Sequence, residues 1–221
     1  VGLGRLHGDV RQPVVELRAK AGVKQMGKLG CVIRVIPTFG HDAMALKRLT
    51  PERNHVRPGF LTGTPDAADA SLPATPQYNA VVLGDALLVT HMKYLHETTQ
   101  MCPEFVQAAQ LLRVWVSQRN SVGRTVGNVP VCGSERVSGF VLTMLLAYLV
   151  RGVQSGGRAG PKLAGTMSGY QLFKGTIEFL AGHDFSETPV QFGTDADLSV
   201  FAEHYSGVFV DPTSSLNLLA G

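Results

Sequence analysis

The residue types that could do chemistry begin with a Gly-Ser pair, Gly133 and Ser134, and with an Asp-Ala-Asp stretch that spans Asp195 and Asp197. A nucleotide-transfer site that uses two metal ions needs a Gly-Ser pair followed closely by two carboxylates spaced as Asp-x-Asp. Here an apolar run follows Glu135, and no Gly-Ser pair precedes Asp195 at the required distance. We therefore interpret both stretches as loops and predict no catalytic residue.

Other site patterns are also missing from the sequence. Neither a dinucleotide-binding GxGxxG nor a phosphate-binding GxxxxGK[ST] occurs, and no Ser/His/Asp or Cys/His set can be argued from spacing. The three cysteines lie far apart, which predicts no disulfide framework and favours a reducing compartment, cytosol or nucleus. His91 and His96 are five residues apart and fall on different sides of a helix. We therefore predict neither a metal site nor a cofactor.

Charge is distributed unevenly along the chain. Residues 1–60 carry 11 Lys or Arg against 4 Asp or Glu, whereas residues 61–221 carry 9 against 13. A basic segment beside a mildly acidic body suggests contact with a polyanion near the N-terminal part, although a solvated basic face is an equally good interpretation.

Arginine is the side chain best suited to bind phosphate, because it can donate two parallel hydrogen bonds. A basic run that comprises Lys47, Arg48, Arg53, His55 and Arg57 precedes a linker, and its lysine and arginines are one group of candidates for RNA or partner binding. A second group, Arg113 and Arg119, flanks the only tryptophan, Trp115, in a helical segment. We interpret Trp115 as a core residue, because aromatic residues in such a stripe are usually buried. The alternative for the basic run is a surface loop that caps the sheet, and for Arg113 and Arg119 it is contact with solvent alone.

The elements that must position these residues follow from hydrophobic periodicity and from turn residues. Two β-branched runs predict neighbouring strands at 13–19 and 31–37. A segment rich in Thr, Pro, Ala and Asp predicts a linker at 62–76. Helices are expected at 75–99, 102–119, 138–152 and 167–182, and a final strand at 208–210. The order of elements predicts an α+β fold in which part of a sheet precedes a helical domain.

Each helix also carries a predicted buried face. The apolar stripes are Val81, Leu88, Met92 and Leu95 in the first helix, Phe105, Ala108, Leu112, Trp115 and Val116 in the second, and Tyr170, Phe173, Ile177 and Leu180 in the fourth. The third helix is apolar nearly all round, which predicts the centre of a bundle. Its apolar run at 139–150 is too short to cross a bilayer.

Five ordered blocks resemble one known family. They are RLTPERNHVRP (48–58), TPQYNAVVLGDAL (75–87), LLRVWVSQR (111–119), TMSGYQLFKGTIEFLA (166–181) and VFVDPTSSLN (208–217). In this order they resemble the nucleolar RNA-associated protein (Nrap) family, which supplies large components of the small-subunit processome. Because the chain opens on Val1 in mid-pattern, we expect a fragment of a longer protein.

The resemblance implies tandem nucleotidyltransferase-like modules and helical modules like those of poly(A) polymerase and oligoadenylate synthetase. Residues 1–60 would be the C-terminal part of a nucleotidyltransferase-like domain, 61–74 a linker and 75–221 the helical domain. It also implies a place in the nucleus, in the nucleolus. Implied partners are pre-rRNA, the box C/D snoRNA particle and other processome proteins, among them a casein-kinase-containing subcomplex, with no membrane contact.

The run CVIRVIP (31–37) departs from what active relatives show. They usually present a third catalytic carboxylate on a strand of this region, where this chain has Arg34, and Glu16 is the nearest strand carboxylate. An arginine would repel Mg²⁺ and favour phosphate. This favours a catalytically inactive scaffold. Two alternatives remain: an active template-independent RNA nucleotidyltransferase that uses Glu16 with carboxylates upstream of Val1, and a module that binds only proteins.

Overall fold

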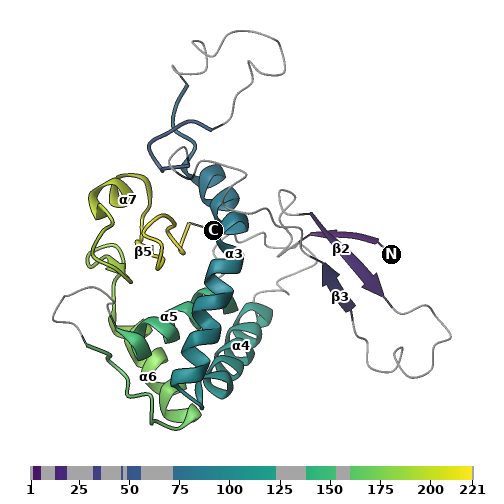
Figure 1. Cartoon of the computed structure of the whole chain (residues 1–221), viewed down its shortest axis with the longest axis vertical. Helices are drawn as coiled ribbons and strands as arrows, with labels where there is room; N and C mark the ends of the chain where they lie inside the picture. Colours follow the sequence, from purple (N-terminus) through teal and green to yellow (C-terminus); the bar gives the residue numbers. More distant parts are fainter. Residues whose placement is uncertain are drawn as a thin grey trace. The chain divides into compact units, whose positions relative to one another are not determined.

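The computed structural model describes residues 2–5, 13–18, 32–35, 46, 49–55, 72–122, 138–152 and 160–220. The chain divides into two units, Val1–Ala43 and Met44–Gly221. Figure 1 shows strands in the first unit and mainly helices in the second. The predicted mixture of a sheet segment and a helical domain is therefore confirmed. That the sheet belongs to a nucleotidyltransferase-like fold, and the domain bounds 1–60, 61–74 and 75–221, stay predictions.

The first unit contains a three-stranded antiparallel sheet. Its strands are β1 (Gly2–Arg5), β2 (Pro13–Arg18) and β3 (Val32–Val35), in that order across the sheet. The predicted pair of neighbouring strands is confirmed as β2 and β3. The sequence GLGR did not suggest β1, because glycine is depleted in strands.

The second unit is built on four helices, whose predicted positions are confirmed to within a few residues. They are α3 (Pro76–Met101), α4 (Phe105–Val122), α5 (Gly139–Arg151) and α6 (Gly169–Gly182). Local sequence fixes their starts. Pro76 occupies the first turn of α3, and Ser138 and Ser168 cap α5 and α6, the latter in a full capping box with Gln171.

The helices are followed by short elements that the sequence only partly indicated. Two parallel strands, β4 (Val190–Gln191) and β5 (Phe209–Val210), lie on either side of α7 (Leu198–His204) in the chain. The expected strand at 208–210 is confirmed as β5. Asp195 and Asp197 are exposed as expected, and Asp197 caps α7 by accepting a hydrogen bond from the Ser199 backbone N–H at 3.0 Å.

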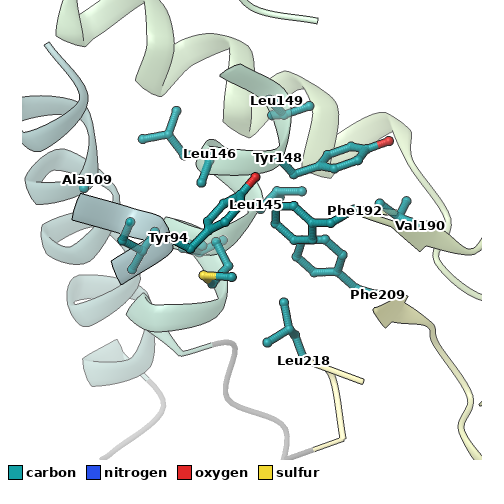
Figure 2. Packing of buried hydrophobic residues seen from close by; sticks show 14 of the residues in the cluster. Tyr94, Ala109, Leu145, Leu146, Tyr148, Leu149, Val190, Phe192, Phe209 and Leu218 are labelled. Atoms are coloured by element: carbon teal, nitrogen blue, oxygen red, sulfur yellow. The ribbon is translucent and has the colours of Figure 1, made fainter. Parts of the chain in front are cut away.

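Helix α5 is the centre of the core, as predicted. Its residues from Leu142 to Val150 are all buried, and the helix packs against α3, α4 and α6. Beside it, Phe192 lies between Tyr94 of α3, at 5.3 Å between ring centroids, and Phe209 of β5, at 5.4 Å, and it also meets Tyr148 of α5 (Figure 2). These aromatic contacts join the C-terminal segment to the helices.

The predicted face of α4 is confirmed: Phe105, Ala108, Leu112 and Val116 are buried, and Trp115 is partly buried against the core.

The predicted stripe of α3 is wrong in part. Leu95 is buried, but Met92 is 56% exposed. The buried face of α3 instead includes the polar residues Asn79, His91 and Thr98, which a hydrophobicity pattern does not count.

The predicted stripe of α6 is wrong for Tyr170, which is 66% exposed, whereas Phe173, Ile177 and Leu180 are partly buried.

Among the described residues, no helix combines the length and apolarity that a membrane span requires.

Candidate nucleic-acid interface

A short loop at residues 50–55 is held against the start of α3. The buried Asn79 side chain donates from Nδ2 to the backbone oxygens of Thr50 and Arg53, both at 2.9 Å. The Thr75 backbone N–H also donates to the Arg53 oxygen, at 3.1 Å. Because three donors hold two carbonyls of the loop, the backbone that carries Arg53 is fixed relative to α3.

The Thr75 hydroxyl bonds to the loop and to Asn79 and does not cap α3. It accepts a hydrogen bond from the His55 backbone N–H at 3.0 Å and donates to Asn79 Oδ1 at 3.0 Å. Thr75 and Asn79 together therefore position both Arg53 and His55.

The clamped loop brings a cation and two aromatic rings to one end of α3. The His55 ring stacks on the Tyr78 ring, with centroids 5.9 Å apart and planes at 24°. Tyr78 is 40% exposed, Gln77 is exposed beside it in the chain, and Arg53 is exposed in the loop. A guanidinium can bind phosphate and an exposed ring can stack on a base, so the group types at this end of α3 are ones that single-stranded RNA can use. We call Arg53, His55 and Tyr78 the α3 cluster.

The other basic candidates do not join this cluster. Lys47, Arg48 and Arg57 lie outside the described residues. Arg113 and Arg119 are both exposed on α4, but six residues apart they point in directions that differ by about 120°. No hydrogen bond, ring contact or ion pair found among the described residues links either of them to Arg53.

The two α4 arginines differ in their surroundings. The Arg113 stem lies against the start of α5, since its Cγ is 3.0 Å from where a Cβ on Gly139 would stand. The Arg119 guanidinium lies 5.8 Å from the centre of the Trp115 ring, a cation–π contact. Trp115 therefore has the core on one side and Arg119 on another, as expected of a structural residue.

Arg34 lies in the first unit, on β3. Its Cα partner across the antiparallel pair is Glu16 of β2. The strand carboxylate that the sequence singled out is thus opposite an arginine in the Cα register.

Sequence reasoning missed a buried hydrogen-bonded pair, His91 with Asp211. The distance from His91 Nε2 to Asp211 Oδ2 is 2.9 Å, and the side chains are 1% and 0% exposed. Asp211 Oδ1 also accepts from the backbone N–H groups of Ser215 and Leu216, and Oδ2 accepts from the Thr213 hydroxyl at 2.7 Å. Both carboxylate oxygens of Asp211 thus accept hydrogen bonds, from the turn that follows Asp211 and from His91 of α3. This arrangement fits a structural role.

The environment of Asp211 favours its charged form. Burial raises the pKa of the carboxyl, but hydrogen bonds from His91, Thr213 and Leu216 outweigh burial and hold the pKa below its ordinary value.

The sequence signal for the turn at Asp211 lies in the block VFVDPTSSLN, which holds an Asp-Pro turn closed by Asn217. Asn217 Oδ1 accepts from the Phe209 backbone N–H at 2.9 Å, and its Nδ2 donates to the Gly207 oxygen at 2.8 Å.

A shallow cavity of about 490 Å³ lies at the end of α6, lined by His183, Asp184, Phe185 and Gly207 among others. Ser186 donates to Asp184 from its hydroxyl and its backbone N–H, and these bonds lower the pKa of the Asp184 carboxyl. The His183 ring stacks on Phe179. These side chains satisfy one another in a local turn and do not form a catalytic set. Within the described part of the chain, no three His, Cys, Asp or Glu side chains converge as metal ligands.

Two protein-family models match consecutive parts of the chain. Residues 104–221 match the PAP/OAS-like domain of the Nrap protein, and residues 2–101 match Nrap protein domain 1. The chain therefore belongs to the Nrap family.

Individual relatives agree with this assignment. The chain is 32% identical over 195 residues to nucleolar protein 6 of Mus musculus, a match that covers 85% of the chain and 15% of that protein. It is 35% identical over 153 residues to U3 small nucleolar RNA-associated protein 22 of Saccharomyces cerevisiae, covering 69% of the chain and 12% of the relative. Nucleolar protein 6 of Drosophila melanogaster is 30% identical over 216 residues, or 95% of the chain and 16% of the relative.

The chain thus spans about 15% of the length of the relatives it matches. Its family is one of nucleolar proteins, and the predicted nuclear and nucleolar location is confirmed by these relatives.

Proposed function

We propose that this chain is a module of a catalytically inactive scaffold that acts in small-subunit rRNA processing and pre-ribosome assembly. The observation that carries the proposal is the match of two consecutive Nrap family models along nearly the whole chain. The yeast relative, whose name associates it with the U3 small nucleolar RNA, supports the same role.

The α3 cluster would supply the RNA contact. Arg53 offers a cation for a phosphate, and the stacked pair of His55 and Tyr78 offers a ring face for a base. Asn79 and Thr75 hold the loop in place before RNA arrives, so little conformational entropy is lost on binding. Lys47, Arg48 and Arg57 precede or follow this loop in the sequence and would extend the basic surface.

The proposed partners are pre-rRNA, the box C/D snoRNA particle and other processome proteins, including the casein-kinase-containing subcomplex that the family resemblance implies. The acidic balance of residues 61–221, with 9 basic against 13 acidic side chains, suits protein contacts for the helical part away from Arg53.

In-cell UV cross-linking of the full-length protein, followed by sequencing of the bound RNA, tests this function. We expect reproducible sites on the small-subunit rRNA precursor or its guide snoRNA. Arg53→Glu should reduce them several-fold, whereas Lys93→Glu, a charge reversal at an exposed cation further along α3, should not. Equal cross-linking of Arg53→Glu and wild type would remove the α3 cluster from the RNA interface.

Catalytic inactivity is proposed from Arg34, which lies opposite Glu16 in the register. The competing function is template-independent addition of nucleotides to RNA 3′ ends, with Glu16 as third carboxylate. Full-length protein incubated with RNA, Mg²⁺ and nucleoside triphosphates should leave RNA length unchanged. Extension of the RNA that Glu16→Gln abolishes would establish the enzyme instead.

A further inference from the structure

The outer face of α4 is exposed although it carries several branched apolar side chains. Val106 is 50% exposed, Leu111 37% and Val114 55%. Val106, Gln110 and Val114 follow one another at four-residue spacing and so form one ridge along the helix. Gln107 and Gln118 are exposed beside this ridge, and Arg113 is exposed at its edge. We call these residues the α4 face.

The composition of the α4 face favours a protein partner over RNA. From Phe105 to Val122 the helix has no Asp, Glu or Lys, and its two charges are Arg113 and Arg119. Binding of single-stranded RNA relies on cations for the phosphates and on exposed rings for the bases, whereas this face offers mainly aliphatic side chains and amides. Depletion of Lys, Asp and Glu together with the presence of Arg is typical of the centre of a protein–protein interface.

The charges on the α4 face also indicate the partner's charge. None of the ion pairs found among the described residues includes Arg113 or Arg119. A partner that brings carboxylates to the edge of the ridge would pair with Arg113, while a basic partner would meet repulsion.

We propose that the α4 face docks an amphipathic helix of another protein, whose apolar stripe packs on Val106, Leu111 and Val114 and whose acidic side chains pair with Arg113. A helix fits because the ridge at four-residue spacing is the feature that interdigitates with the ridges of a second helix. This inference assigns Arg113 to a protein contact and is independent of RNA binding by the α3 cluster.

Site-specific photo-cross-linking in the full-length protein tests the proposal. Benzoylphenylalanine would replace Gln110, in the middle of the ridge, and irradiation of cells would be followed by sequencing of the cross-linked peptides. The expected product is a peptide of another protein with apolar residues at helical spacing and flanking Asp or Glu.

Matched variants then test each part of the interface. Val114→Glu and Arg113→Glu should each reduce this product about tenfold, Arg113→Lys should reduce it less, and Val89→Glu should leave it unchanged. Val89 is the matched control because it is 49% exposed on α3, close to the 55% of Val114. Far-ultraviolet circular dichroism of the Val114→Glu and Val89→Glu proteins should show equal helix content.

Four outcomes would overturn the proposal. They are a cross-link to RNA, a cross-link to another part of the same chain, no cross-link at Gln110, and equal loss of the product in Val89→Glu and Val114→Glu. In each case the cross-links of the α3 cluster to RNA would still decide the proposed function separately.

Discussion

His91 of α3 and Asp211, which follows β5, form a buried hydrogen-bonded pair across 120 residues of sequence, with 2.9 Å between Nε2 and Oδ2. His91 lies in the segment that matches Nrap domain 1, and Asp211 lies in the segment that matches the PAP/OAS-like domain. Tyr205 makes a second such link, since its hydroxyl donates to the Pro76 oxygen at 2.9 Å. Helix α3 is therefore part of the same core as α5 and the C-terminal segment.

Removal of the Asp211 carboxylate should be among the most destabilising single changes. Asp211→Ala leaves His91 and the turn donors without their acceptor in a buried site, and each donor left unsatisfied costs about 1–3 kcal/mol of unfolding free energy. Urea unfolding of the 221-residue chain, followed by circular dichroism, measures this. The control is Asp195→Ala, an exposed carboxylate expected to change stability by less than about 0.5 kcal/mol. Similar losses for both variants would contradict the structural role of Asp211.

The same carboxyl predicts a pH dependence of stability. Because its pKa in the folded state lies below the ordinary value of about 3.9, Asp211 contributes stability that is fully present above that value and is lost as pH falls through the folded-state pKa. The unfolding free energy of wild type should therefore fall more steeply below about pH 4 than that of Asp211→Asn. Parallel curves for the two proteins would show that Asp211 does not titrate as described.

The clamp on the loop at 50–55 makes a separate prediction. Asn79→Ala removes two donors to the loop carbonyls of Thr50 and Arg53 and should lower the unfolding free energy by about 1–3 kcal/mol. The loop would then be held less firmly, so the amide of His55 should exchange with solvent faster. Hydrogen exchange measured by mass spectrometry tests this, with the exposed Gln77→Ala as control. Unchanged exchange at His55 would show that the other bonds suffice.

Much of the helical unit could be predicted from sequence because local signals agree. Pro76, Ser138 and Ser168 mark helix starts, and the apolar spacing of α4 and α5 gives their buried faces correctly. Prediction failed for the buried face of α3, where Asn79 and His91 are buried because distant residues supply their hydrogen-bond partners.

The candidate site could be predicted only in part for a similar reason. A basic run in the sequence included Arg53 and His55, but Tyr78 meets His55 only through a loop clamped from more than 20 residues away. Arg113 and Arg119 looked like a pair in sequence, yet their six-residue spacing separates them around the helix. The two-residue strands β4 and β5 are too short to give a period-two pattern.

A last prediction concerns the fluorescence of Trp115. Because it is the only tryptophan in the chain, the tryptophan emission comes from this residue alone. It packs against the core and beneath Arg119, which predicts a structural role. Single-stranded RNA added to the 221-residue chain should leave its emission unchanged while binding is followed by the anisotropy of labelled RNA. Tyr78→Ala should weaken that binding by about 1–3 kcal/mol, the value of one base stacked on an aromatic ring. Quenching of Trp115 in proportion to bound RNA would instead place a base on its ring, and would assign α4 to the RNA interface.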